Sequence, residues 1–450
     1  MSFVFAKISI RGWLTGRRNT GHDFVGRSTG AGALSIWTHY LKGFTPLANY
    51  TAGAFRGDAA HVGVSLEAWE AHQAMATHNV TIVAPSFSTV GAFAGYMSGG
   101  GHSSLVSYHG LASDQVLSLN VVTASGSFVT ASPGTNPDLF FALRGGGGGT
   151  YGIITSVVVK TFAPVNITST AKITISSLET GLDAFWQAMR VYHSFGGAIA
   201  DAGGIDRTYI YPLNNATVFN FTTQVEFPSR SVSEVSALLS RITSAFASLN
   251  ITAPFPVPTI RPWSAVVLGE GSPIRNERFA SRLMPRSVWD SPIGFSQAMS
   301  AMRKVCEGGY QVHGTHMGPS LAVAGYPGNT SSVNPAFREA VMHLVVYDSA
   351  HTEGVTAAQD KANRRRLHRY TDYLREATKQ SGSYINEAAV DEPAWQASFF
   401  GKGNYERLLE VKRRWDPEGV FWGPATVGSE GWKVAGEWGD STQDGRLCRV

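Results

Sequence analysis

One histidine, His22, stands inside a run of closely spaced glycines near the start of the chain, NTGHDFVGRSTGAG over residues 19–32. Glycines this close together suit neither a regular helix nor a packed strand, and they let a bound group approach the main chain. Exposed N–H groups beside Arg27 suit a phosphate or pyrophosphate. Composition alone leaves two interpretations open. One is a glycine-rich turn with a surface histidine, and the other is a cofactor loop in which His22 is bonded covalently to the ligand.

Two further glycine runs follow in the first third of the chain. VGAFAGYMSGGGHS covers residues 90–103 and is followed by YHGLASD at 108–114, and RGGGGGTYGII covers residues 144–154. The 90–103 run carries little side-chain bulk, so a flat ligand can lie on its backbone, while a pair of tight turns in a sheet is the alternative. The sequence contains neither a Walker motif nor a strand-linked G-x-G-x-x-G with a downstream acid, which argues against a Rossmann dinucleotide site.

In this order the three runs resemble the flavin loops of the vanillyl-alcohol-oxidase and berberine-bridge-enzyme family, and most closely its fungal members of the isoamyl alcohol oxidase-like type. The resemblance implies FAD, bound covalently to His22 through the 8-methyl group of the flavin. Many relatives carry a cysteine as a second tether, but Phe87 stands there in SFSTVG (86–91), so no cysteine tether is expected. The resemblance assigns these residues to the flavin site: Gly21, His22, Arg27, Ser28, Gly91, Gly99, Gly100, Gly101, His102, Ser103, Gly110, Leu111, Asp114, Gly152, Ile153 and Ile154.

The candidate catalytic residues lie in SYINE, residues 383–387. By resemblance to the family's Tyr-x-Asn motif, Tyr384 is the expected base, and Asn386 lies on the same strand face and reaches toward the flavin. A base is needed because hydride loss from an alcohol is easier as the hydroxyl proton leaves. The alternative for Tyr384 is a packed aromatic. Glu387 is a second candidate base, which strand alternation would send to the other face.

The elements that position these residues are expected to form an α+β protein. The resemblance implies a PCMH-type FAD-binding domain over residues 1–163, a substrate domain with an antiparallel sheet over 164–380, and a berberine-bridge-type segment over 381–450 that packs back on the FAD domain. Apolar patterns predict strands at 34–41, 60–64, 80–84, 154–162, 171–176, 217–227 and 342–347, and helices at 66–78, 182–195, 233–249 and 353–379. This mixture suits an antiparallel sheet with helices on one face.

Net charge, apolar runs and histidine spacing argue against nucleic-acid binding, a membrane helix and a metal site. A net charge of +4 over 450 residues does not argue for nucleic acid, and no apolar run is long enough for a membrane helix. His313 and His316 do not form a metal pair, because an odd separation in a strand sends the two rings to opposite faces, so no metal is expected. The expected partners are a small-molecule alcohol and oxygen, and the oligomeric state is open. Cys306 and Cys448 either pair or stay free.

The chain carries conflicting signals about its location. Met1 to Arg18 does not read as a signal peptide, because Lys7 and Arg11 interrupt its short apolar part. Glycosylation sequons indicate a secretory route, with the cytoplasm as the alternative. These sequons begin at Asn49, Asn79, Asn166, Asn215, Asn220, Asn250 and Asn329. By resemblance, a strand–helix–strand unit should precede the histidine loop. Only Met1 to Arg18 do so here, so weak flavin binding is expected of the chain as it stands.

The predicted activity is that of an FAD-dependent oxidase. The resemblance implies hydride transfer from an alcohol, such as an intermediate of a natural-product pathway, to the flavin, which oxygen reoxidises to give hydrogen peroxide. The isoalloxazine carries the redox chemistry, and the protein supplies orientation and a base. Two alternatives stay open: a sugar or oligosaccharide oxidase of the same family, and an inactive flavoprotein remnant.

Overall fold

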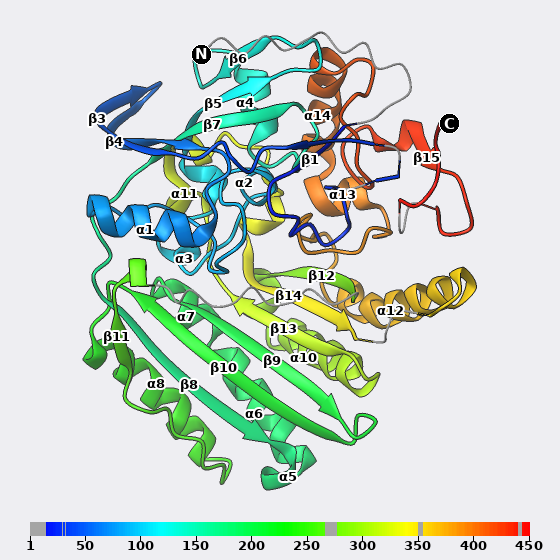
Figure 1. The fold of residues 1–450 in the computed structure, drawn as a ribbon. Coiled ribbons are helices and arrows are strands. Elements are labelled where there is room, and N and C mark those ends of the chain that lie inside the picture. Colours follow the sequence, from blue (N-terminus) through cyan, green and yellow to red (C-terminus); the bar gives the residue numbers. More distant parts are fainter. Residues whose placement is uncertain (1–14, 29, 32, 266–276, 350–353, 440–442) are drawn as a thin grey trace.

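The computed structural model describes residues 15–28, 30–31, 33–265, 277–349, 354–439 and 443–450, whose arrangement is drawn in Figure 1. The expectation about the segment before the histidine loop falls mainly on residues 1–14, which lie outside the described residues. Strand β1 (Thr15–Arg18) pairs in parallel with β2 (Leu34–Trp37). The two ends of the run that contains His22 therefore lie side by side.

The first half of the molecule is built on an antiparallel sheet with the strand order β3-β4-β7-β5-β6. Its central strands read VLSLNVV and IITSVVVK, and these β-branched residues fit a buried, pleated surface. Helix α1 ends at His78, and the next residue, Asn79, takes a left-handed backbone conformation and caps the helix. The elements are β3 Phe44–Ala52, β4 Phe55–Gly63, α1 Ala68–His78, α2 Gly95–Ser98, α3 Val106–His109, η1 Ala112–Gln115, β5 Val116–Val122, β6 Phe128–Ala131, α4 Pro137–Leu143 and β7 Ile153–Lys160.

The second half carries an antiparallel sheet with the order β11-β8-β10-β9-β13-β14-β12, in the lower part of Figure 1. Four long helices, α6, α8, α10 and α12, contribute side chains to the core beneath one face of this sheet. The strands are β8 Thr168–Ser176, β9 Ile205–Leu213, β10 Val218–Pro228, β11 Thr259–Arg261, β12 Arg278–Pro285, β13 Gln311–His316 and β14 Ala340–Asp348. The helices are α5 Ser177–Thr180, α6 Leu182–Ser194, α7 Gly196–Asp201, α8 Val232–Ala247, η2 Trp263–Ala265, α9 Arg286–Trp289, α10 Pro292–Glu307, α11 Leu321–Gly328, η3 Pro335–Phe337 and α12 Ala357–Ala377.

Alternation along the strands of the second sheet separates core side chains from functional ones. On β13, Val312 lies in the core while its neighbour His313 lines a cavity on the opposite face, and on β14 Val346 and Tyr347 divide in the same way. This follows from the two-residue period of a strand. The helix-covered face therefore stabilises the sheet, and the other face is turned toward the glycine loops.

The C-terminal segment contains α13 Trp395–Phe400, α14 Lys402–Trp415, η4 Ser429–Gly431, β15 Trp432–Val434 and β16 Leu447–Arg449. Leu408 and Val411 of α14 join the hydrophobic core of the first sheet. Lys412 Nζ donates to the Thr150 carbonyl oxygen at 2.7 Å and pairs with Asp416 Oδ2 at 2.6 Å. These contacts fix the last part of the chain against the first half of the molecule.

The predicted α+β class is confirmed, with some local corrections. Residues 81–84 are buried, but apart from a bridge between Thr81 and Phe162 the predicted strand at 80–84 does not form. Residues 383–387 form turns, so the predicted alternation that sends Glu387 away from Tyr384 is wrong. Cys306 is buried, Cys448 is exposed, and both are free. Within the described part of the chain, every helix is too short or too polar to span a membrane.

Candidate active site

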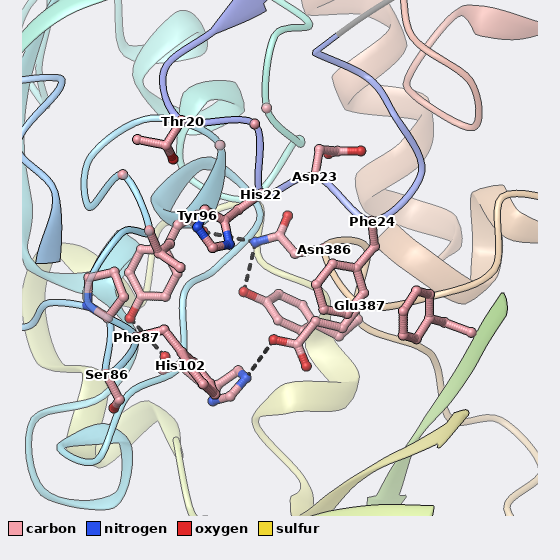
Figure 2. A pocket seen from close by; sticks show the side chains of 18 of the residues that line it. Thr20, His22, Asp23, Phe24, Ser86, Phe87, Tyr96, His102, Asn386 and Glu387 are labelled. Atoms are coloured by element: carbon pink, nitrogen blue, oxygen red, sulfur yellow. Dashed lines mark hydrogen bonds and ion pairs between the residues drawn. The ribbon is translucent and has the colours of Figure 1, made fainter. Parts of the chain in front are cut away.

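A cavity of about 310 Å³ lies between the glycine loops, the open face of the second sheet and residues 383–387. Figure 2 shows the close approach of these parts, with His22 above and the paired side chains of His102 and Glu387 below. Of the predicted site residues, those that line the cavity are Gly21, His22, Arg27, Ser28, Gly91, His102, Tyr384 and Asn386. One cavity thus combines the predicted flavin loops and the predicted catalytic residues.

His22 is partly buried at one side of this cavity. Its Nε2 lies 2.7 Å from the hydroxyl oxygen of Thr89, within hydrogen-bond distance. Burial lowers the pKa of His22, and the charge of Glu67 opposes this effect only in part. The imidazole is therefore neutral near pH 7, the form in which a ring nitrogen has a lone pair available for bonding.

Arg27 and Asn19 present buried polar atoms that have no hydrogen-bond partner among the described residues. The Arg27 guanidinium pairs with Asp23 at 3.3 Å and donates to the carbonyl oxygens of Pro424 and Ile385. Its Nη2, and both polar atoms of the Asn19 side chain, are buried with no partner among the described residues. Unpaired buried polar atoms are costly, and both residues line the cavity, so the site fits a ligand with a polar edge or a phosphate.

The glycine run at residues 90–103 leaves space for two asparagine side chains, one of them from the segment 383–387. A Cβ on Gly99 would collide with the side-chain amide of Asn386, and one on Gly91 would collide with that of Asn19. Gly101 has a φ of +80°, a conformation that favours glycine. Glycine at positions 91 and 99 therefore leaves the space that the Asn19 and Asn386 amides occupy.

Tyr384 is held by two donors and is almost fully buried. Its hydroxyl oxygen accepts hydrogen bonds from the Gly101 N–H at 3.0 Å and from Asn386 Nδ2 at 2.7 Å. Asn386 Nδ2 also donates to the Tyr96 carbonyl oxygen at 3.0 Å. Burial, followed by the charge of Glu387, raises the pKa of Tyr384 well above its ordinary value, so this side chain remains a neutral phenol.

Glu387 faces histidines from two other parts of the chain. Its Oε1 lies 2.9 Å from His102 Nε2, and its Oε2 lies 3.6 Å from Nδ1 of the buried His343. The ligand atoms of these three residues all lie within 4.8 Å of one another, a geometry that could also hold a metal ion. Sequence reasoning did not find this cluster, because the three residues come from distant segments with no motif spacing.

Aromatic side chains form the wall on the side of the second sheet. The Phe24 and Phe279 rings lie 4.5 Å apart between centroids, and Tyr209 stacks on His313 at 4.3 Å. Arg207 also lines this wall, but its charge is matched by Glu226 at 2.7 Å. The wall therefore offers flat aromatic faces to a bound molecule.

The remaining predicted flavin residues lie away from the cavity. Gly99, Gly100, Gly101 and Ser103 lie in the loop behind it, while Gly110, Leu111, Asp114, Gly152, Ile153 and Ile154 lie farther along the first sheet and its loops. Asp114 is buried and pairs with Arg338 at 2.7 Å, where it joins the first half of the chain to the second. It also accepts from the Leu111 N–H at 2.9 Å.

Other residues of the cavity were not singled out from the sequence. Asn19 is the first residue of the glycine run at 19–32, so its place in the sequence already indicated a position near the cofactor. Tyr209 and Tyr347 alternate with core residues along strands, a pattern that marks a second face but does not reveal a cavity there. His343 lies within a buried strand and no sequence pattern distinguishes it.

Two family models match the parts of the chain that line the cavity. Residues 17–132 match the model of an FAD binding domain, and residues 383–428 match the family described as berberine and berberine like. The chain is 34% identical over 443 residues to the FAD-linked oxidoreductase patO of Aspergillus clavatus, covering 96% of this chain and 73% of that protein.

Solved structures show the same fold. The VAO-type flavoprotein MtVAO615 from Myceliophthora thermophila C1 superposes with a TM-score of 0.87 at 28% identity, covering 97% of this chain and 78% of that one. A glucooligosaccharide oxidase from Acremonium strictum, described as having a 6-S-cysteinyl, 8α-N1-histidyl FAD, gives a TM-score of 0.72 at 18% identity over 93% of this chain and 87% of that one.

The contact between Gly99 and Asn386 yields a first prediction. Gly99→Ala should lower the flavin content per chain while the protein stays folded, because Asn386 must move and release Tyr384 and Tyr96. Flavin absorbance per chain and a thermal unfolding curve measure the two effects. Gly403→Ala is the matched control, since a Cβ there meets no atom within 4 Å. Full flavin content in Gly99→Ala would contradict the importance of this contact.

Proposed function

The chain belongs to the family of FAD-linked oxidoreductases of the vanillyl-alcohol-oxidase and berberine-bridge type, and from this premise we propose that it is an alcohol oxidase. A hydride would pass from an alcohol carbon to FAD, and oxygen would accept the electrons to give hydrogen peroxide. The observation that carries the proposal is the single cavity that joins the His22 loop, the Tyr384–Asn386 pair and the aromatic wall.

The residues of the cavity fit FAD. His22, Asn19 and Arg27 would hold it, since His22 is neutral and the other two carry buried polar atoms without protein partners among the described residues. Bound FAD would supply the two-electron oxidation. The proposed covalent link runs through His22 alone. Phe87 is half exposed and lines the same cavity, but a phenyl ring cannot form a thioether.

The protein's own groups would bind and orient the alcohol. Phe24, Phe279 and Tyr209 exclude water from one side and offer flat faces to an apolar substrate. Asn386 Nδ2 donates a hydrogen bond to the Tyr384 hydroxyl oxygen and so holds it in place. Tyr384 as the base stays a prediction, and its raised pKa argues for a positioning role instead.

Oxidation of a sugar is the second candidate. The fold likeness to the glucooligosaccharide oxidase supports it, as do the stacked rings of Tyr209, Tyr211 and His313, which could lie against a sugar ring. The third possibility, an inactive flavoprotein remnant, predicts a site that does not reduce its flavin with any alcohol.

We propose passage through the secretory pathway on the positions of the sequons. Asn49, Asn79, Asn166, Asn215, Asn250 and Asn329 are exposed, so a glycan could be attached to each without disturbing the core. Asn220 differs, since it lies within β10, where its side chain accepts a hydrogen bond from Ser176 at 2.7 Å.

The oxidase proposal predicts a selective reaction with alcohols. The purified flavoprotein is mixed without oxygen with a panel of aryl, allyl and aliphatic primary alcohols and of mono- and oligosaccharides, and flavin absorbance is followed. An apolar alcohol should bleach the flavin fastest, because the wall is aromatic and its charges are paired. Admitting oxygen should then restore the colour and release peroxide. Faster bleaching by a sugar would favour the second candidate, and a flavin that no compound bleaches would favour the remnant.

The tether proposal predicts a single flavin-bearing peptide. After acid precipitation and proteolysis, the flavin should remain on the peptide that contains His22, and His22→Ala should release it on denaturation. Thr89→Val serves as a comparison, because it removes the neighbour of His22 Nε2 and leaves the ring itself intact. A flavin peptide without His22, or flavin that survives denaturation in His22→Ala, would refute the link.

A further inference from the structure

Glu387 is one of three carboxylates that line the cavity, together with Asp23 and Glu277. It lines the cavity beside Tyr384 and Asn386, and 24% of its side chain is exposed, whereas Tyr384 is only 1% exposed. Figure 2 shows its carboxylate facing His102, with the Asn386 side chain above it. A substrate in the cavity can therefore reach this carboxylate more readily than the phenol.

The groups around Glu387 keep it ionised. Burial acts to raise its pKa, but the charge and hydrogen bond of His102, with smaller effects of His343 and His313, lower it to about 2. Burial lowers the pKa of His343 to about 3 and that of His313 to about 4, so both rings are neutral near pH 7 and His102 is the effective partner. Tyr384 keeps its proton under the same conditions.

We propose that Glu387, paired with His102, receives the hydroxyl proton of the alcohol, and that Tyr384 positions the site without taking that proton. The inference rests on the oxidase function proposed above. The geometry supports it in three ways. The carboxylate lines the cavity, its Oε1 is oriented by His102 at 2.9 Å, and the Tyr384 oxygen already accepts two hydrogen bonds.

The reaction balances with these groups. The O–H bond of the alcohol breaks and its proton joins the Glu387 carboxylate. The C–H bond would break with both of its electrons, which bound FAD would accept as a hydride, so the alcohol would become a carbonyl compound. Glu387 Oε1 and His102 Nε2 lie 2.9 Å apart, so the proton that reaches the carboxylate stays within a hydrogen-bonded pair.

The contact with Glu387 gives His102 a second role, which is to orient the carboxylate, in addition to its predicted place in the flavin site. In the tautomer that donates Nε2–H to Glu387, the imidazole fixes the carboxylate in one orientation. His343 approaches the second oxygen at 3.6 Å and limits its rotation. His102, from the first half of the chain, and His343, on β14, thus orient the Glu387 carboxylate. Glu387 itself comes from the C-terminal part of the chain.

The test uses the flavin-loaded protein and the panel alcohol that reduces the wild-type flavin fastest. Anaerobic flavin reduction is followed over a range of alcohol concentrations in wild type, Glu387→Gln, Tyr384→Phe and the control Glu410→Gln, an exposed carboxylate on α14. Glu387→Gln should lower the limiting rate by roughly 10²–10⁴-fold, the range for loss of a general base, with flavin content and half-saturating alcohol concentration close to wild type. Tyr384→Phe should lower it far less.

A chemical rescue separates a base from a structural support. In Glu387→Ala, added formate should restore part of the limiting rate because it supplies a carboxylate to the vacated space, whereas added chloride should not. An unchanged limiting rate in Glu387→Gln, or a collapse in Tyr384→Phe with Glu387→Gln intact, overturns the inference alone. If no alcohol reduces the wild-type flavin, the oxidase function fails first and the inference falls with it.

Discussion

The close contact between the glycine run and residues 383–387 is the constraint on which the site depends. Tyr384 and Asn386 reach the backbone of this run through hydrogen bonds to Gly101 and Tyr96, and Gly99 leaves the space for the Asn386 amide. These few contacts join the end of the chain to its first third. The second sheet then closes the cavity from below with its uncovered face, so three distant parts of the chain form one site.

Charge pairing decides which chemistry this site can support. Arg27 pairs with Asp23, Arg207 with Glu226 and Glu387 with His102, so the buried charges of the wall are matched. Such pairs are stable in a partly buried cavity because each charge keeps a nearby opposite partner. Glu387 stays ionised beside His102, whose charge and hydrogen bond lower the pKa of the carboxyl group.

The α+β class could be predicted because it depends on local features such as strand alternation, whereas the assignment of the glycine runs to a flavin site rests on their resemblance to the family. The sequence did not reveal that Glu387 faces the same cavity, because residues 383–387 form turns where a strand was expected. His343 escaped notice for a different reason, since it lies among apolar residues of β14 and only the folded chain brings it to Glu387. Asp114 carries a clear motif, but in the structure it pairs with Arg338 and lies away from the cavity.

The central claim is that one cavity holds the flavin and brings its reactive face to Glu387. The most direct measurement is an experimental structure of the protein purified with its flavin. The account predicts isoalloxazine density in the cavity, continuous with the His22 side chain, with the ring lying between His22 and the Glu387–His102 pair. Flavin density elsewhere in the molecule, or a ring separated from Glu387 by protein, would contradict it.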